Sequence, residues 1–354
     1  MRTIRENAEA ILAGDQPDYY FDFMYSMTLV PDPEELRSPK PKRGGEEVVD
    51  EWGVTYQWPE GAQGPQPVAR PETLAIPDIQ SFAKHLIVPD VYGADWTETK
   101  RQADAVDREE KYVAIMSGCG LFERSHTLMG LENALRNYLL SPDKVWELLN
   151  IIKDYKIAYL EEAAVNIQPD VVFYHDDWGH KRNVFLPPDI WRKMIKPLHA
   201  EIVAKAHELG IFFLHHADCI LEPLVMDMVD MGIDAWQGVI AQNDILEIQR
   251  VTKGRLAMIG GFDSYRLDTS STTEADIRAE VRRVIDTYCP AGRFFPGIPN
   301  GILYTPGLMS IYLDEMASYG REWALKNPMD KFSDEALRET DYKKDNVSLV
   351  CAVA

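Results

Sequence analysis

Short apolar runs alternate with longer helical patterns over most of the chain after residue 110. Each short run is apolar almost throughout, which is typical of strands buried on both faces of a sheet. The longer segments carry apolar residues three and four positions apart, and one of them opens with an N-cap serine, Ser141, followed by Pro142. We predict strands at 112–116, 171–174, 211–214, 235–237, 256–259 and 294–295, and helices at 141–164, 189–209, 223–231, 244–252, 274–288 and 306–325.

The N-terminal third has a different pattern. Residues 3–13 predict a short amphipathic helix that ends at Gly14, and the aromatic run 18–25 predicts a buried strand. Residues 31–75 are rich in proline, glycine and charge, with one hairpin expected at 54–58. We interpret this stretch as an excursion from the main fold, such as a lid, and not as a second domain.

These elements predict an α/β fold, because strand-then-helix units joined by short loops build a parallel sheet. The number of units favours a closed (β/α)8 TIM barrel over an open sheet, and no glycine-rich phosphate turn follows the first strand. We expect one domain over 1–354, with a mobile tail from about residue 335. In such a barrel the chemistry lies where strands end and loops begin.

The net charge indicates which partners the protein avoids, and the cysteine spacing indicates its redox compartment. The formal net charge of −20 over 354 residues repels nucleic-acid phosphate and anionic lipid, so we expect neither nucleic acid nor membrane as a partner. The four cysteines lie far apart without a paired spacing, which favours a reduced cytoplasmic compartment. The charged N-terminus argues against a signal peptide, and no apolar run is long enough to span a membrane.

Two groups of polar residues follow predicted strands. His175, Asp176 and Asp177 end one strand, and burying consecutive unpaired acids costs several kcal/mol, so at least one should meet a metal, a cation or a proton. The structural alternative is that one aspartate caps the next turn while the other pairs with Lys181 or Arg182.

The second group follows the strand 211–214. Alternation places His216 and Asp218 on one side of the chain and His215 on the other, with Cys219 adjacent. A histidine and an acid on one side beside a thiol could hold a metal, although a histidine at a strand end can also be purely structural. Weaker candidates for ligand contact are Asp22, Gln237 and Asp263, and the turn 117–120 could cradle an anion.

At these residues the chain resembles the uroporphyrinogen decarboxylase superfamily and, within it, the branch of corrinoid-dependent methyltransferases. The resemblance covers residues 3 to about 323, and the motifs together are specific for the superfamily. The matching segments are the opening 3–18, the motif 49–54, the block 175–179 with 185–188 and Pro197, and the block 216–219 with 232–234.

Two departures from the family's patterns bear on function. Uroporphyrinogen decarboxylases carry an arginine-rich N-terminal motif for the many carboxylates of their substrate, whereas residues 22–27 contain no arginine. Thiol-methylating members hold zinc with His-x-Cys and a distant cysteine, whereas here Asp218 stands two residues after His216 and the segment 296–301 has no cysteine. Oxygen ligands make a harder metal site, which suits an ether or alcohol oxygen better than a thiol.

The resemblance therefore implies a methyltransferase of the O-demethylase type. It would move a methyl group from a small O-methylated substrate, which we expect to be aromatic, to a separate corrinoid protein. The implied zinc ligands are His216, Asp218 and Asp177 with Cys219 as a spare, and His175 or Asp177 could act as a general acid. The alternatives are a decarboxylase of a smaller ring substrate and a non-catalytic binding protein of the same fold. Expected substrate contacts come from Asp22, Tyr25, Trp178 and Gln237.

Overall fold

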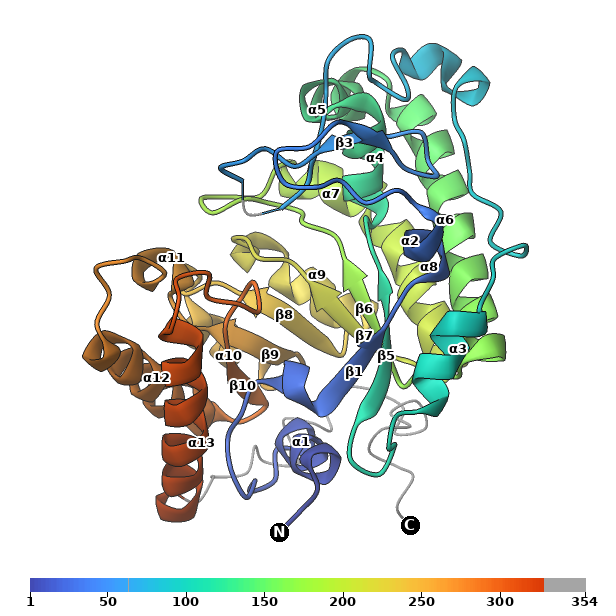
Figure 1. Ribbon diagram of the computed structural model, residues 1–354. Coiled ribbons are helices and arrows are strands. Elements are labelled where there is room, and N and C mark those ends of the chain that lie inside the picture. The colour runs from blue at the N-terminus through green and yellow to red at the C-terminus, as the bar shows by residue number, and fades with distance from the viewer. Residues whose placement is uncertain (63, 328–354) are drawn as a thin grey trace.

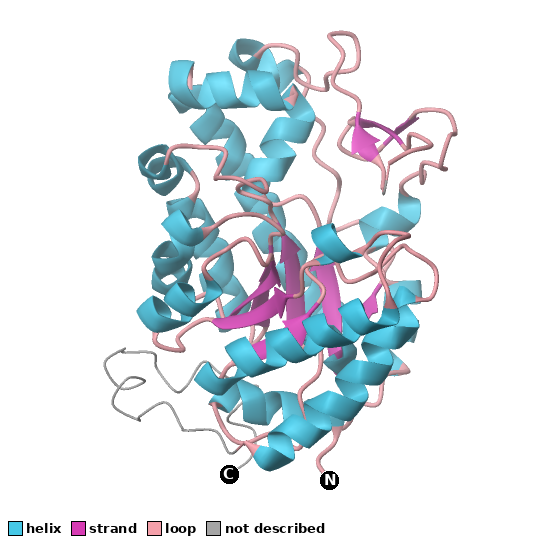
Figure 2. Cartoon of the chain, turned by 90° about the vertical axis from the view of Figure 1, so that its left-hand side faces the viewer, coloured by secondary structure: helices cyan, strands magenta, loops and turns pink. Residues whose placement is uncertain are grey.

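Seven parallel strands form one sheet at the centre of the molecule, with helices packed around it (Figures 1 and 2). The computed structural model describes residues 1–62 and 64–327, so the tail expected from about residue 335 lies outside the described residues. The strand order follows the chain, which gives every crossover the same sense. In this order the strands are β1 (Met27–Val30), β5 (Tyr112–Ser117), β6 (Val171–His175), β7 (Phe212–His216), β8 (Ala235–Val239), β9 (Ala257–Gly261) and β10 (Phe294–Gly297).

Most of the predicted helices are present, and the described chain contains further ones between β1 and β5 and directly after β5. The helix predicted at 189–209 is divided at Ile195, because Pro197 lies in the first turn of a new helix, where a missing N–H is tolerated. The α-helices are α1 (Ile4–Ala13), α2 (Pro33–Arg37), α3 (Thr97–Asp104), α4 (Leu121–Met129), α5 (Leu131–Leu140), α6 (Pro142–Asn166), α7 (Pro188–Met194), α8 (Lys196–Glu208), α9 (Val225–Met231), α10 (Ile245–Thr252), α11 (Ser264–Leu267), α12 (Glu274–Tyr288) and α13 (Leu308–Lys326). The 3₁₀ helices are η1 (Phe23–Ser26), η2 (Ile79–Lys84), η3 (Glu222–Leu224) and η4 (Cys289–Ala291).

The strand predicted at 18–25 was wrong. Asp22 accepts a hydrogen bond from the Met24 amide at 3.0 Å and caps η1, so this stretch turns, and the strand begins only at Met27. The Phe23 ring packs edge-on against Phe295 of β10, with ring centroids 5.0 Å apart. The aromatic pattern therefore reflects core packing between the two ends of the sheet.

The parallel α/β sheet confirms the predicted class, whereas an eight-stranded closed barrel stays a prediction. Within the described residues, the hydrogen-bonded ladder runs from β1 to β10 without joining them. The segment around Asp22 lies between these ends, and its carboxylate accepts a hydrogen bond from the Ile298 amide at 3.4 Å. None of the helices in the described part of the chain combines the length and apolar character that a membrane crossing requires.

The excursion at 31–75 forms its own small antiparallel sheet, set apart from the main sheet in Figure 2. The predicted hairpin is present, with Val48 and Val49 paired to Tyr56 and Thr55. Two contacts anchor this sheet to the helices below it: Asp50 pairs with Arg124 of α4 at 3.2 Å, and the Trp52 ring packs on Tyr155 of α6. Its strands are β2 (Val48–Val49), β3 (Thr55–Gln57) and β4 (Gln66–Pro67).

Candidate functional site

Three polar side chains lie side by side where β6, β7 and β8 end. The register pairs His175 with His216 and His216 with Gln237, so they occupy equivalent positions on neighbouring strands. The two imidazole rings stack with centroids 4.4 Å apart. Nδ1 of His216 donates a hydrogen bond to the Gln237 side-chain oxygen, and the Gln237 amide in turn donates to the Pro299 carbonyl at 2.9 Å. This chain of bonds fixes the His216 ring and leaves its Nε2 available as a ligand atom.

Asp177 and Asp218 join His216 in a first cluster. Each of the three offers one ligand atom, and these atoms lie within 4.8 Å of one another. The two aspartates follow β6 and β7, and the Asp218 amide donates to the Asp177 carboxylate at 3.0 Å. The structure thus brings together the three residues that the sequence analysis assigned to a metal. The site has the donor set of a zinc or another divalent ion.

A second cluster shares Asp177 and includes a residue that the sequence analysis missed. Glu123, in the first turn of α4, lies 2.7 Å from Nδ1 of His175, and the ligand atoms of Glu123, His175 and Asp177 are also within 4.8 Å of one another. An acid in the first turn of a helix is common because it interacts favourably with the helix dipole, so the position of Glu123 in the sequence does not by itself indicate this role. Its one distinctive feature is the position just after the turn 117–120.

The pKa values of His175 and His216 are shifted in opposite directions. Burial lowers the pKa of His175, but Glu123 outweighs it and raises that pKa to about 10, which keeps the ring protonated at neutral pH. Burial and the neighbouring charge of His175 lower the pKa of His216 to about 4, which keeps this ring neutral. Burial also raises the pKa of Asp177 to about 7, with Glu123 acting in the same direction. The cluster therefore holds a proton donor beside a neutral imidazole.

Asp176 has a structural role. Its carboxylate accepts hydrogen bonds from the amides of Phe122 and Glu123 at 3.3 and 2.8 Å and from the Trp178 indole at 2.8 Å, so it caps α4 from another part of the chain. Gly120 makes the approach possible, because a Cβ there would lie 2.4 Å from Asp176 Cβ. Asp176 is therefore a capping residue, as the structural alternative expected, but for the earlier helix α4 and not for the next turn.

Lys181 was one of the two cations expected to pair with Asp176 or Asp177, but it pairs with Asp218 instead. The Lys181 ammonium lies 2.7 Å from the carboxylate of Asp218, which also accepts a hydrogen bond from the Tyr265 hydroxyl at 2.9 Å. The Asp218 side chain is 24% exposed and Lys181 is more so, which places this pair at the solvent side of the cluster. Lys181 can therefore move away when Asp218 takes another partner.

Several expected site residues lie elsewhere. Trp178 is fully buried and packs on His215 and Trp191, as a core residue does, and its contact with a substrate stays a prediction. Cys219 is buried, burial raises the pKa of its thiol, and within the described chain it belongs to neither cluster, which argues against its role as a spare ligand.

Asp22 and Tyr25 lie with η1 between the ends of the sheet. Asp22 is buried, and burial raises its pKa to about 6, whereas Tyr25 is 40% exposed. Neither residue belongs to the two clusters found among the described residues, so their contact with a substrate stays a prediction.

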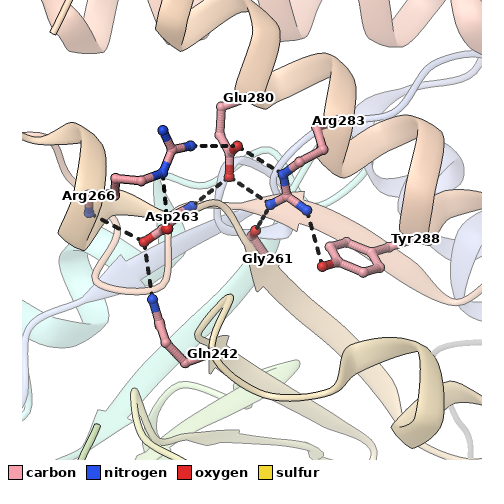
Figure 3. A network of polar contacts seen from close by, with 7 residues as sticks. All are labelled: Gln242, Gly261, Asp263, Arg266, Glu280, Arg283 and Tyr288. Atoms are coloured by element: carbon pink, nitrogen blue, oxygen red, sulfur yellow. Dashed lines mark hydrogen bonds and ion pairs between the residues drawn. The ribbon is translucent and has the colours of Figure 1, made fainter.

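Asp263 holds loops and helices together (Figure 3). Its carboxylate accepts hydrogen bonds from the Gln242 amide at 3.2 Å and from the Arg266 backbone at 3.3 Å, and its own amide donates to Glu280 at 2.9 Å. Glu280 also pairs with Arg283 at 2.7 Å. These bonds join α11 to α12, which makes Asp263 structural.

Comparisons with known proteins identify the fold and the family. A solved structure of a methyltransferase from Methanosarcina mazei has the same fold, with a TM-score of 0.63 and 14% sequence identity, over 90% of this chain and 99% of that one. No curated protein matches the chain. The sequence profile of the family described as uroporphyrinogen decarboxylase (URO-D) matches residues 98–297, which span β5 to β10 and more than half of the chain. The chain therefore belongs to the uroporphyrinogen decarboxylase family.

Proposed function

We propose that the protein is a cytoplasmic methyltransferase on a (β/α)8 barrel, which moves a methyl group from an O-methylated aromatic substrate to a corrinoid protein. The observation that carries this proposal is the convergence of Asp177, His216 and Asp218 within 4.8 Å at the carboxyl ends of neighbouring strands. The fold shared with the methyltransferase from M. mazei supports transfer of a methyl group in general.

The donor set of this cluster fits zinc. The hydrogen bond from Nδ1 of His216 to Gln237 selects the tautomer whose Nε2 can bind a metal, and the low pKa of His216 keeps protons from competing. Asp177 and Asp218 add oxygen ligands. When bound, zinc would act as a Lewis acid at the ether oxygen and so weaken its bond to the methyl carbon.

The protein's own residues supply the proton. When the bond between oxygen and methyl carbon breaks, its electron pair stays on oxygen, and the methyl group passes to the corrinoid as a cation equivalent. An aryl oxide leaves more easily when it is protonated. His175 holds a proton at neutral pH because Glu123 pairs with it, and it stacks on His216, so it is the best-placed general acid.

Decarboxylation of uroporphyrinogen is not favoured by this site. Its substrate would bring many carboxylates, which bind to arginines in proteins. The two clusters contain the acids Glu123, Asp177 and Asp218, and the cations beside them are already paired, His175 with Glu123 and Lys181 with Asp218. Such a site would repel a polyanion.

The test combines metal analysis with a transfer assay. The purified protein should contain about one zinc per chain and should methylate a reduced corrinoid protein from aryl methyl ethers. His216→Gln keeps much of the side-chain volume but removes the imidazole, so it should lose both zinc and activity. Gln242→Ala, at the same edge of the sheet but outside the clusters, should keep both. Formation of coproporphyrinogen at an enzymatic rate, or full activity in His216→Gln, would overturn the proposal.

A further inference from the structure

A cavity of about 370 Å³ lies beneath the excursion at 31–75. Its walls come from the excursion, from the end of β5 and the turn after it, from α4 and from α6, and none of the residues of the two clusters lines it. The volume is within the range of small-molecule sites in proteins. The excursion therefore covers a second space, separate from the proposed methyl-transfer site.

Lys156 and Arg124 are buried cationic side chains that line this cavity, and neither has all of its donors satisfied. Lys156 is 4% exposed, and its ammonium donates only to the Gly118 carbonyl at 2.5 Å; no described carboxylate lies within ion-pair distance. Arg124 is 5% exposed, and although it pairs with Asp50, its Nε is buried with no hydrogen-bond partner. Leaving such donors unsatisfied is costly, which indicates that a ligand completes them.

The acids that line the same cavity already accept hydrogen bonds from neighbouring groups of the protein. Glu34 accepts a hydrogen bond from the Tyr155 hydroxyl, and Asp32 accepts one from the Glu34 amide at 2.7 Å. Asp50 accepts hydrogen bonds from two backbone amides of its own turn, at 2.9 and 2.8 Å, besides its contact with Arg124. The unsatisfied nitrogens at the cavity are those of Lys156 and Arg124, which suit an anion.

The remaining walls are aromatic. Tyr56 and Trp58 of the excursion and Tyr155 and Tyr159 of α6 line the cavity, together with three prolines of the excursion. Flat rings of this kind favour a planar ligand by stacking or edge contacts. A ligand with a ring and an anionic group would satisfy both parts of the lining.

We propose that this cavity binds an aromatic carboxylate, with its carboxylate held by Lys156 and Arg124 and its ring held between the excursion and α6. Arginine and lysine at one site are well suited to a carboxylate, since both donate charge-assisted hydrogen bonds. The proposal goes beyond the proposed methyl transfer and does not depend on it, because no residue is shared between the two sites.

The test is calorimetric titration of the full chain with benzoate, benzamide and acetate. Benzamide has the ring without the charge, and acetate has the charge without the ring. We expect benzoate to bind with a dissociation constant below about 1 mM, and the other two to bind at least about tenfold more weakly. Weaker benzoate binding than this limit, or benzamide binding as tightly as benzoate, would show the proposal to be wrong.

Variants locate the binding. Lys156→Met should weaken benzoate binding at least about tenfold. Its melting temperature without ligand should hold or rise, because a buried ammonium is removed. Lys144→Met, on the exposed side of the same helix and paired with Glu147, is the matched control and should bind benzoate normally.

Trp58→Ala independently tests the side of the cavity that the excursion forms. It should weaken benzoate binding while leaving the main fold intact. Unchanged benzoate affinity in Lys156→Met would place the ligand elsewhere. If that variant does not fold, unchanged affinity in Trp58→Ala would lead to the same conclusion.

Discussion

The neighbouring acids Asp176 and Asp177 have different roles because their surroundings differ. Asp176 receives three hydrogen bonds and caps a helix, whereas Asp177 lies between two clusters of potential ligand atoms. Burial raises the pKa of both carboxyls to about 7. Asp176 is fully buried with three hydrogen bonds, whereas Asp177 is partly exposed, and these two differences separate the capping residue from the candidate ligand.

Glu123→Gln should lower the pKa of His175. The glutamate opposes the effect of burial and raises that pKa to about 10, so without its charge burial would dominate. His175 would then lose its proton near or below neutral pH. Methyl transfer should fall as pH rises through this range, whereas the native protein should keep its general acid. Titration of the histidine by NMR measures the shift directly, and an unchanged His175 pKa in this variant would contradict the prediction.

At the residue scale, part of the site could be predicted from local sequence. His216 and Asp218 are two positions apart at a strand end, and Asp177 ends the preceding strand, so alternation and strand adjacency place them together. Glu123 could not be predicted in this way. It lies 52 residues from His175, on a different element, and only the packing of α4 against the end of β6 brings the two together.

Helix α4 shows how one element depends on another. Its N-cap is Gly120, which has no side chain to accept hydrogen bonds, so the first amides bind Asp176 from the loop after β6. The sequence analysis did not predict this helix, because the usual N-cap residue is absent from its own sequence. By contrast, the strands from β5 to β10 were confirmed, since runs of buried apolar residues mark them directly.

Gly120→Ala should destabilise the protein. The added Cβ would lie 2.4 Å from Asp176 Cβ and Cγ, so the helix start or the loop must shift, at a cost of about 1–3 kcal/mol. The shift should also separate Glu123 from His175 and lower the pKa of the latter. Urea unfolding measures the first effect. Gly61→Ala is the control, because a Cβ there meets nothing within 4 Å, and an equal loss in both variants would rule out the clash.

The His207–Asp234 pair should make stability depend on pH. Burial lowers the pKa of His207, but its hydrogen bond and ion pair with Asp234, at 2.9 Å, outweigh burial and raise the pKa above its usual value. The pair therefore contributes full stability below about pH 6.5, and this contribution is lost as pH rises through the raised pKa. His207→Gln should cost more free energy of unfolding at pH 6 than at pH 9. Urea titrations at the two pH values decide this, and an equal cost at both would show that His207 is uncharged in the folded protein.

At the scale of the whole molecule, the excursion at 31–75 stays attached to the main fold through buried contacts. The ion pair of Asp50 with Arg124 and the packing of Trp52 on Tyr155 join the two sheets through α4 and α6. The sequence could identify this stretch as an excursion from its prolines and glycines. It could not show which helices it covers, because that depends on contacts between segments far apart in the chain.

We expect one cooperative thermal transition for the main fold. The sheet and its helices share one continuous hydrophobic core, and the excursion contributes few residues to it. Differential scanning calorimetry should give one main peak, with at most a small separate one from the excursion. Two well-separated peaks of comparable size would mean that the chain contains two domains.

The close approach of Gly120 to Asp176 also has a consequence for how related sequences vary. A side chain at position 120 would meet Asp176 Cβ at 2.4 Å and the Tyr174 ring at 2.6 Å, so it fits only if position 176 becomes glycine and the ring at position 174 gives way. The start of α4 would then lose its cap, so such a chain needs an N-cap residue of its own before the helix. Positions 120 and 176 should therefore change together among relatives, as a linked pair that neither position reveals by itself.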